Sequence, residues 1–437
     1  MDTLQSKLKT VLSSITPKPR RLLVAFSGGI DSMVLLHSLA TLDYPGIDNI
    51  VALHVDHGLQ TDSPNWVSHC REQCKELGID FLSTSVDITQ YSGEGLEDKA
   101  RNARYHWFAS VCSDDDVVLT AHHLSDNAET VLYNLVRGAG TRGLSGIQAT
   151  RAMGEGRLLR PFIDVTKAEI LDYAATHSLV CVEDPSNQDV RFDRNFLRTD
   201  ILPRLQSRWP AASRGIVRSA ENAYEAQVLA DELAEIDLSA CLAKITFYPV
   251  DENAVLRVDR LQRLSRVRIK NLLRFWLWIC NAAPLSRARQ DYVIRHLLGD
   301  GLHGSFRWAN CQMHRYRDHL FLQIGSIAIE NLRLQWNLQH PLPLGETGLV
   351  LSTGQSTGPI EVEVTLGNQA RAFKRSESSN PRSLKKLFQA ASVPVFLRPL
   401  LPVVSRKDVT LAIPGVFVSE DFRDQNGSPI TLNLARQ

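Results

Sequence analysis

The sequence predicts an α/β fold: a doubly wound parallel sheet, followed by a mainly helical domain and a small α+β C-terminal domain. Three observations lead to this prediction. Strand-like and helix-like segments alternate over the first 200 residues, helical patterns dominate from about residue 213, and strand patterns dominate from about residue 333. A chain of 437 residues is long enough for two or three domains. We therefore expect domains at 1–212, 213–330 and 331–437.

The first domain contains four predicted strands, each followed by a helix. The strands are expected at 22–26, 50–55, 81–86 and 117–121, and the helices at 31–40, 64–77, 97–112 and 126–136. Ligands of such sheets bind at the carboxyl ends of the strands. Polar clusters stand at three of those ends, namely Ser27-Gly28-Gly29, Asp56-His57-Gly58 and His122-His123.

The later elements follow from the same patterns. Residues 137–162 are rich in glycine and arginine and predict a mobile loop. A helix is expected at 166–177, with Thr166 as N-cap and Glu169 in the capping-box position. Further helices are expected at 213–242, 258–280 (one helix or a pair), 286–298 and 383–390, and a β-hairpin at 306–324.

The corner between the first strand and its helix, SGGIDS at residues 27–32, predicts a phosphate-binding loop. Glycines let the backbone approach an anion, and a helix N-terminus points N–H groups at it. Ser27 and Ser32 can donate hydroxyl groups. Asp31 fits an anion site when a divalent cation bridges it to the phosphates, so the segment predicts a nucleotide with Mg²⁺. The chain lacks the Gly-Lys dipeptide of the ordinary P-loop, and GxGxxG is absent from this corner.

Charge and composition indicate the partner and the compartment. The net charge of +1 hides an acidic first 254 residues and a basic remainder, which favours nucleic acid as a partner over a merely solvated surface. The N-terminal MDTLQSKLKT lacks the pattern of a secretory signal, and no apolar run could span a bilayer, so we expect a cytoplasmic protein. The seven cysteines show no two-residue spacing and predict reduced thiols. The oligomeric state stays open, a homodimer included.

Several motifs together resemble one family. SGGIDS resembles the signature of the PP-loop ATP pyrophosphatases, and LHVDHGL (53–59) resembles the second strand end of one branch of them. The resemblance narrows to the tRNA(Ile)-lysidine synthetases through motifs spread over most of the chain: GLEDKARNARY (95–105), AHHLSDNAET (121–130), RGAGTRGLSGI (137–147), EDPSNQDVRFDRNFLR (183–198), ILPRL (201–205) and SLKKLFQAASVPVFLRPLLPVV (383–404).

The resemblance implies a reaction in two steps. ATP adenylates O2 of cytidine 34 in the CAU anticodon of an isoleucine tRNA, and pyrophosphate leaves. The amine of free lysine then attacks C2, and AMP leaves. The product, lysidine, pairs with A instead of G, so codon reading changes from AUG to AUA.

Site residues are expected in four groups. The ATP-binding residues would be Ser27, Gly28, Gly29, Ile30, Asp31, Ser32, His54 and Asp56, with Asp31 also on magnesium. Asp126 and Glu129, three residues apart on one helix, would hold the lysine. Asp31, Asp126, His123 and Arg104 would be catalytic, with Glu97 and Arg101 facing the same site. Contacts with tRNA are expected from Arg137, Arg142, Arg194, Asn195, Arg198, Arg266, Lys270, Lys374, Lys385 and Lys386.

Two features leave alternatives open. Family members carry two adjacent aspartates where this chain has Ser125-Asp126, which leaves the role of the first carboxylate in question. A tRNA thiolase on the same fold is the main alternative function, although it would call for paired cysteines. A small-molecule amidating ligase and a non-catalytic tRNA-binding protein fit the basic half and the intact SGGIDS less well.

Overall fold

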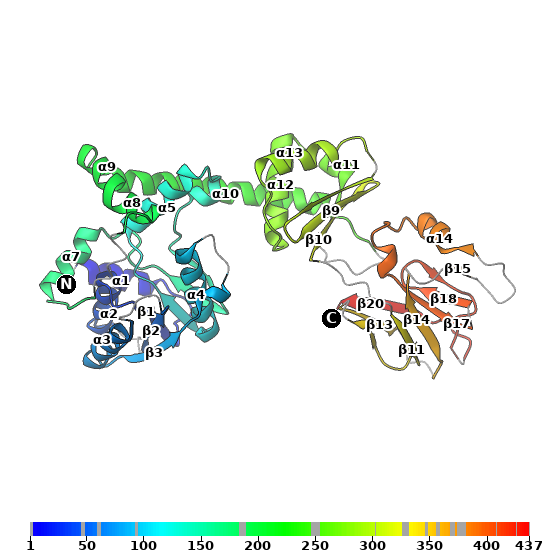
Figure 1. The fold of residues 1–437 in the computed structure, drawn as a ribbon, viewed down its shortest axis with the longest axis horizontal. Helices are drawn as coiled ribbons and strands as arrows, with labels where there is room; N and C mark the ends of the chain where they lie inside the picture. Colours follow the sequence, from blue (N-terminus) through cyan, green and yellow to red (C-terminus); the bar gives the residue numbers. More distant parts are fainter. Residues whose placement is uncertain are drawn as a thin grey trace. The chain divides into compact units, whose positions relative to one another are not determined.

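The computed structural model describes residues 3–44, 49–58, 63–91, 95–182, 189–245, 254–301, 303–325, 332–345, 348–354, 359–367, 372–373, 382–407, 409–424 and 426–436. Two compact units divide the chain, Met1–Leu229 and Ala230–Gln437 (Figure 1). Each unit has its own cores, and each is described in turn.

The first unit is built on a six-stranded sheet in the order β3-β2-β1-β4-β6-β5. All neighbouring pairs are parallel except β5 with β6. The strands are β1 Arg21–Ala25, β2 Ile50–Asp56, β3 Asp80–Ser85, β4 Asp116–Leu119, β5 Thr150–Met153 and β6 Gly156–Leu159. From β1 the chain adds β2 and β3 on one side of the sheet and then crosses to β4 on the other side. Such a reversal of strand order opens a crevice, which is expected here between the carboxyl ends of β1 and β4.

Helices cover both faces of this sheet (Figure 1). On β1, Leu22 and Val24 pack into the core on one face, and Leu23 packs into the core on the other. This explains the unbroken apolar run, since a strand buried on both faces has no polar alternation. Each such side chain contributes about 1.5–3 kcal/mol to folding. The helices are α1 Thr3–Ser13, α2 Ile30–Ala40, α3 Ser63–Glu76, α4 Leu96–Val111, α5 Leu124–Val136 and α7 Lys167–Thr176, with a 3₁₀ turn η1 at Ile88–Gln90.

The glycine- and arginine-rich stretch 137–162 is more ordered than predicted, and the prediction of a mobile loop is wrong. It contains a short helix, α6 Thr141–Leu144, and the hairpin of β5 and β6, which extends the sheet. The two strands meet at Gly154-Glu155, where Gly154 has a φ of 56°. Met153 and Leu158 are buried and fix the hairpin on the core. Two buried side chains in a polar stretch give too weak a pattern to predict two strands.

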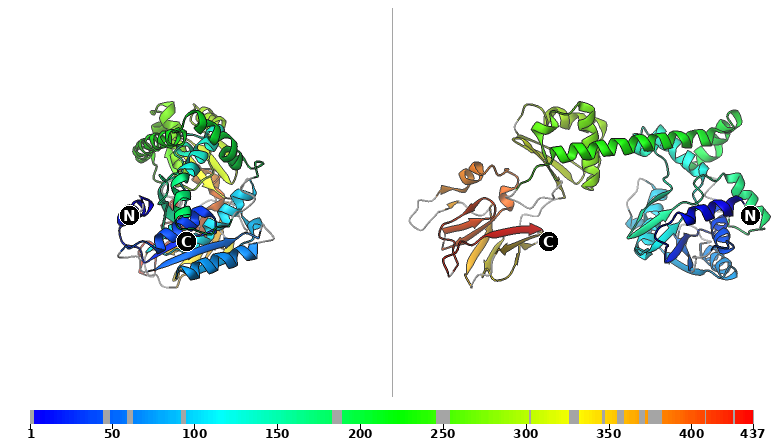
Figure 2. Two further views of the ribbon diagram at one scale, coloured as in Figure 1. Left: turned by 90° about the vertical axis from the view of Figure 1, so that its left-hand side faces the viewer. Right: turned by 180° about the vertical axis from the view of Figure 1, so that it is seen from behind.

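Three helical segments that the sequence patterns did not predict lead into a long helix that contains the boundary between the two units. They are α8 Asp193–Phe196, a π-helical segment η3 Leu197–Ile201 and α9 Leu202–Arg208. The predicted helix at 213–242 forms as α10 Ala212–Cys241, one continuous element in every view (Figure 2). A π-helical segment often lies at a functional site, and η3 carries Arg198.

The second unit begins within α10, whose C-terminal part packs with an antiparallel sheet and three further helices around one core. The sheet has the order β7-β10-β9-β8. The predicted hairpin at 306–324 is in fact three strands joined by two tight turns. The elements are β7 Val255–Arg257, α11 Val258–Leu261, α12 Arg266–Ile279, α13 Arg287–His296, β8 His303–Trp308, β9 Cys311–Tyr316 and β10 His319–Ile324. Trp276 belongs to this core and is fully buried.

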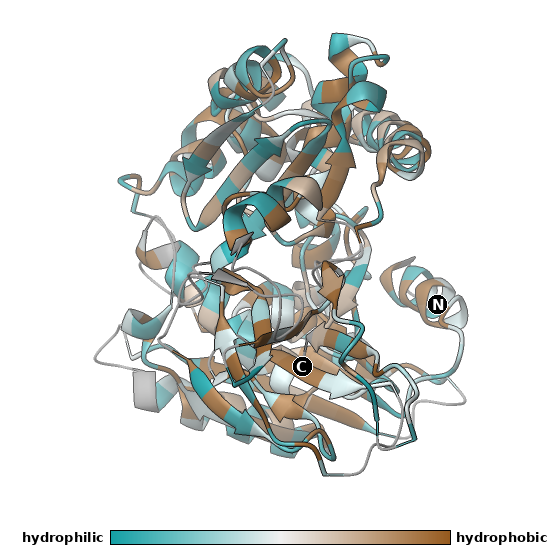
Figure 3. Ribbon diagram, turned by 90° about the vertical axis from the view of Figure 1, so that its right-hand side faces the viewer, coloured by the Kyte–Doolittle hydropathy of each residue, from teal (hydrophilic) through white to brown (hydrophobic). Residues whose placement is uncertain are grey.

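The C-terminal part is β-rich with one α-helix, as predicted. Its core lies between a five-stranded sheet, β11-β14-β17-β18-β19, and a three-stranded sheet, β12-β13-β20. Figure 3 shows hydrophobic and hydrophilic stretches along its strands. The elements are β11 Arg333–Trp336, β12 Leu342–Pro343, β13 Leu349–Thr353, β14 Val362–Leu366, β15 Ala372–Phe373, β16 Arg382–Ser383, α14 Leu384–Ala390, η5 Arg398–Leu400, β17 Pro402–Arg406, β18 Val409–Ile413, β19 Phe417–Val418 and β20 Leu432–Arg436.

Over the described residues, the helices lack the combination of length and apolarity that crossing a membrane requires.

Candidate functional site

The loop between β1 and α2 has the hydrogen bonds of a preformed anion cradle. The Ser32 hydroxyl donates to the Gly29 carbonyl oxygen at 2.9 Å and accepts from the Ser27 N–H at 3.2 Å. The Ser27 hydroxyl lies 3.1 Å from that of Ser32. Gly29 caps α2 without a side-chain hydrogen bond to the first turn in the described chain. The first-turn N–H groups and the helix dipole of α2 therefore suit a phosphate group.

Gly28 is the residue in this loop that the backbone geometry requires. Its φ is +83°, and a Cβ placed there would lie 2.8 Å from the Cys70 sulfur. The Gly28 carbonyl also accepts a hydrogen bond from the Val182 N–H at 2.9 Å. The loop is thus held from behind by α3 and from beside by the segment after α7.

His123 and Asp126 form the N-terminal cap of α5 and line the site at the same time. The Asp126 carboxylate accepts from the His123 backbone N–H at 2.9 Å, and His123 Nδ1 accepts from the Ser125 N–H at 3.2 Å. Because Nδ1 is an acceptor, the ring proton is on Nε2. That nitrogen lies 3.7 Å from the Asp31 carboxylate and 3.6 Å from that of Asp126.

The predicted pair Asp126 and Glu129 does share one face of α5, and Arg198 of η3 binds both. Arg198 donates to the two Glu129 oxygens at 2.9 and 2.8 Å and lies 3.4 Å from Asp126. Burial raises the pKa of Glu129, and the Arg198 guanidinium lowers it in part. Burial lowers the pKa of Arg198, but its hydrogen bonds to Glu129 outweigh this and raise the pKa overall.

Asp31 is bound by Lys167, a residue that the sequence did not single out. Lys167 Nζ lies 2.5 Å from Asp31 Oδ1, and both side chains are about one-third exposed. Lys167 is the first residue of α7, which the predicted capping box of Thr166 and Glu169 starts. The predicted N-cap Thr166 could have indicated Lys167, because a helix that begins beside the cradle places its first residue near Asp31.

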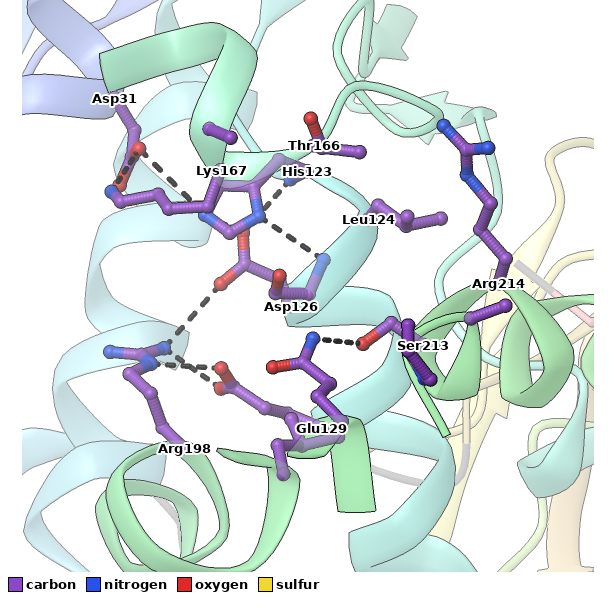
Figure 4. Close-up of a pocket in the computed structure, with 16 residues that line it drawn as sticks. Asp31, His123, Leu124, Asp126, Glu129, Thr166, Lys167, Arg198, Ser213 and Arg214 are labelled. Carbon is purple, nitrogen blue, oxygen red and sulfur yellow. Dashed lines mark hydrogen bonds and ion pairs between the residues drawn. The ribbon is translucent and has the colours of Figure 1, made fainter. Parts of the chain in front are cut away.

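These groups line a pocket of about 770 Å³. Figure 4 shows Asp31, His123, Asp126, Glu129, Lys167 and Arg198 converging in it. The other wall comes from α9, the turn that follows it and the start of α10, including Leu202, Gln206, Pro210, Ser213 and Arg214. Three carboxylates, the positive side chains of Lys167 and Arg198, and the imidazole of His123 suit a small ligand that carries both an ammonium and a carboxylate group.

A second group of side chains, with the opposite charge, lies by His122. Three guanidinium carbons lie near the centre of the Tyr105 ring, at 5.6 Å for Arg101, 5.8 Å for Arg104 and 4.3 Å for Arg151. Arg160 is 4% exposed, and its Nε has no hydrogen-bond partner among the described residues. We call these four residues the arginine cluster. Clustered guanidinium groups suit phosphate oxygens.

The arginine cluster perturbs the groups it surrounds. Burial, and then the charges of Arg160, Arg104 and Arg101, lower the pKa of His122 well below its usual value. Burial alone would raise the pKa of Tyr105, but the four guanidinium groups lower it. Thr120 Oγ1 lies 2.8 Å from His122 Nδ1. His122 and His123 thus face different groups, as expected of neighbours at a strand end, and a shared metal role for them has no support.

The side chains at the end of β2 form hydrogen bonds with backbone groups, which the sequence did not predict. His54 is buried, and its Nδ1 lies 2.9 Å from the Phe26 carbonyl oxygen. Asp56 accepts from the Gly58 N–H at 2.8 Å. His57, which carries no predicted role, has a buried Nδ1, and burial followed by the Arg104 charge lowers its pKa to about 4. An adenosine contact from His54 and Asp56 stays a prediction.

The predicted RNA-binding residues fall in separate places. Arg137 and Arg194 both lie over the Tyr133 ring, at 5.1 and 5.6 Å from its centre. Asn195 Nδ2 donates to the Asp189 carbonyl oxygen at 3.0 Å. Arg266 and Lys270 both bind Asp291, at 2.8 and 2.6 Å. Lys385 and Lys386 are exposed on α14, whereas Lys374 lies outside the described residues. Arg142 is exposed on α6, and the Glu97 side chain lies outside what is described.

The cysteines do not form a reactive centre. Burial raises the pKa of Cys70 and of Cys74 to about 12, and that of Cys241 to about 11. All seven thiols are free. Reactive thiols have lowered pKa values, so these groups do not support sulfur transfer. Among the described residues, there is also no group of three His, Cys, Asp or Glu side chains placed to hold a metal ion.

Comparisons with known proteins match most of the chain. Residues 1–205 match the PP-loop domain model, residues 256–321 the TilS substrate binding domain and residues 362–434 the TilS substrate C-terminal domain. The chain is 39% identical to the tRNA(Ile)-lysidine synthase of Pseudomonas aeruginosa, over 90% of this chain and 89% of that one. It is 37% identical to that of Alkalilimnicola ehrlichii, over 92% and 91%.

A solved structure, the U34-tRNA thiolase NcsA from Methanococcus maripaludis with its [4Fe-4S] cluster, is a more distant match. It aligns with a TM-score of 0.44 and 20% identity over 51% of this chain and 78% of that chain.

Proposed function

The chain belongs to the tRNA(Ile)-lysidine synthase family, and from this we propose how its residues divide the work of the reaction. The chain is an ATP-using enzyme of the PP-loop family that modifies tRNA(Ile). As a carbon–nitrogen ligase, it joins L-lysine to C2 of cytidine 34 in the CAU anticodon through an adenylated cytidine. Lysidine, AMP and pyrophosphate are the products, and the codon read changes from AUG to AUA.

The observation that supports this division is the separation of charge on either side of the His122-His123 pair. His122 adjoins the arginine cluster, and His123 adjoins the carboxylates of Asp31 and Asp126. A phosphate-rich leaving group fits the first side and a cationic amine fits the second. The cytosine would occupy the crevice between β1 and β4, where both groups can reach it.

In the first step, cytosine O2 attacks the α-phosphorus of ATP, and the bond to pyrophosphate breaks. The protein has to position the phosphates and balance the charge that develops on them. We assign the pyrophosphate end to the loop of Ser27–Ser32 and to Arg104 with the rest of the arginine cluster. His122 stays neutral near pH 7 because of its lowered pKa, so it can exchange hydrogen bonds with phosphate oxygens without adding charge.

In the second step, the amine nitrogen of lysine attacks C2, and the bond between C2 and the AMP oxygen breaks. The ammonium ion must first lose a proton, because only the neutral amine has a lone pair. We assign ammonium binding to Asp126 and Glu129 and the removal of the proton to Asp126. Arg198, bound to both carboxylates, is placed to receive the α-carboxylate of the substrate.

Magnesium fits the donor set at Asp31. Mg²⁺ prefers oxygen ligands and is commonly held by one or two carboxylates together with substrate phosphates. Asp31 offers one carboxylate beside the cradle. When bound there, the ion would neutralise phosphate charge. Asp31 contacts Lys167 in this structure, so the two cations would share or exchange that carboxylate.

The tRNA contacts are proposals of the same kind. Positive side chains that bind phosphates position an RNA without reading its sequence. We assign that role to Arg137, Arg194 and Arg198 near the site, and to Arg266, Lys270, Lys374, Lys385 and Lys386 beyond it. Asn195 is uncharged and would contact the RNA through its amide. We also propose a cytoplasmic location. A homodimer is the oligomeric state to test.

The deciding experiment supplies the protein with ATP, labelled lysine and an unmodified CAU-anticodon isoleucine tRNA. We expect label to enter the tRNA only when ATP is present, and the same tRNA with uridine at position 34 to stay unlabelled. Absence of label in the complete mixture contradicts the function. Asp31→Ala should lose labelling, and full activity of that variant would contradict its place at the phosphates.

A further inference from the structure

The face of α5 that lines the pocket continues past the carboxylates into a different kind of surface. Asp126, Glu129, Tyr133 and Arg137 follow one another at helical spacing, so they lie along one side of α5. Tyr133 lies about 6 Å along the helix from Glu129. The surface at this end combines an aromatic ring, positive charge and exposed apolar area.

Two helices contribute the charge around the Tyr133 ring. Arg137 comes from the end of α5, with its guanidinium carbon 5.1 Å from the ring centre, and its Nη1 donates to the Tyr133 hydroxyl at 2.5 Å. Arg194 comes from α8 and lies 5.6 Å from the ring centre. Val136, one turn beyond Tyr133, is 81% exposed. Arg198, one turn after Arg194, is the residue that binds the pocket carboxylates.

We propose that Tyr133, flanked by Arg137 and Arg194, is a binding subsite for an anticodon-loop nucleotide next to the one that is modified, with the ring stacking on its base. This inference rests on the proposed function and extends its site. The physical reason is that a base entering an enclosed pocket must leave its stack. Its neighbour then loses a stacking partner, and an aromatic ring or a guanidinium plane can replace that partner.

Arginine suits both parts of such a nucleotide. Its planar group can bind a phosphate through two donors and can also lie against a ring. Tyr133 lies on the same helix as Asp126 and Glu129, the carboxylates assigned to the substrate amine. The subsite and the reacting base would therefore keep a fixed spacing. A surface tyrosine on another element would lack this fixed spacing from the pocket.

The test is a double-mutant cycle between the protein and the RNA. Tyr133→Leu removes the ring, and Tyr133→Phe keeps it without the hydroxyl. Each variant is paired with isoleucine tRNA that is intact, abasic at position 33 or abasic at position 35. We expect Tyr133→Leu to weaken binding of intact tRNA between about 5-fold and 150-fold and Tyr133→Phe to have a much smaller effect.

The cycle separates stacking from a structural role. If the ring stacks on a base, Tyr133→Leu has no further effect on the tRNA that lacks that base, and the abasic position that removes the effect identifies the neighbour. If the loss is the same on all three RNAs, the ring supports the helices and the proposal is overturned. An unchanged affinity for intact tRNA also overturns it.

Two controls keep the result clear. Tyr44→Leu alters a half-buried tyrosine that follows the C-terminal end of α2, and it should leave tRNA affinity unchanged. Lysine KM should stay the same in Tyr133→Leu, because the carboxylates remain. If the unaltered protein attaches no lysine to any tRNA, the proposed function fails; if it attaches lysine and Tyr133→Leu changes nothing, only the subsite fails.

Discussion

The carboxylate of Asp126 serves both the fold and the pocket, and substitutions can separate the two roles. It accepts the hydrogen bond that caps α5 and faces the pocket beside Arg198. Asparagine keeps an acceptor oxygen but loses the charge, whereas alanine loses both. The difference between these two variants therefore isolates the contribution of the charge.

We expect Asp126→Asn to raise the KM for lysine at least tenfold with little loss of stability. Asp126→Ala should show the same loss of lysine binding and also a lower free energy of unfolding, by about 0.5–2 kcal/mol for the lost cap. Urea denaturation measures stability and labelled lysine measures KM. An unaltered KM in both variants would place the lysine elsewhere.

His57 allows a prediction about pH. Its pKa is about 4 in the folded chain, against an ordinary value of 6.5. Between these two values the unfolded chain binds a proton that the folded chain does not, so acid favours unfolding. Stability should fall as the pH is lowered from about 6.5 to about 4. His57→Gln should reduce this slope, as measured by urea midpoints at several pH values, and an identical slope would show that His57 does not titrate as described.

At the scale of elements, the backbone of the SGGIDS turn requires glycine at position 28 but not at position 29. Gly28 has a positive φ and Cys70 at its back, whereas Gly29 has a φ of −74°, and a Cβ added to it would lie 3.5 Å from its nearest neighbouring atom. Gly28→Ala should therefore destabilise the protein by about 1–2 kcal/mol or more and abolish ATP use. Gly29→Ala should keep the stability, as thermal unfolding would check. Equal stability of the two variants would contradict the strain assigned to Gly28.

The sequence predicted the elements whose apolar residues form an unbroken run or a regular repeat. The strand runs before SGGIDS and before His122-His123 are buried on both faces, so their apolar content is unbroken and easy to detect. The hairpin of β5 and β6 and the segment α8–η3 depend on few buried residues, such as Met153 and Leu197, and were not predicted.

The site was predictable to the same uneven extent. Asp126 and Glu129 follow from helical spacing, because that spacing acts within a single element. Lys167 and the arginine cluster come together from separate segments, and local patterns do not carry that information. From the sequence, His123 received a role and His122 did not, because both stand in the same motif and only the fold shows which side each faces.

At the scale of the whole molecule, the basic second half makes a prediction about salt. Arg266 and Lys270 share Asp291, whose pKa their hydrogen bonds lower to about 2. Reversing both charges should weaken tRNA binding and reduce the slope of log affinity against log salt by about one for each phosphate group that is no longer bound. Filter binding between low and moderate salt measures the slope. Lys75→Glu, exposed on α3, is the matched control, and equal slopes in all variants would place the RNA elsewhere.

The contact between Lys167 and Asp31 raises a question of chemoselectivity. A reaction that joins a primary amine to an activated base takes place beside a primary amine that belongs to the enzyme itself. Lys167 pairs with Asp31, whereas the substrate amine would meet Asp126, to which we assign the removal of its proton. The pocket therefore separates two chemically equivalent amines by the carboxylate that each one meets.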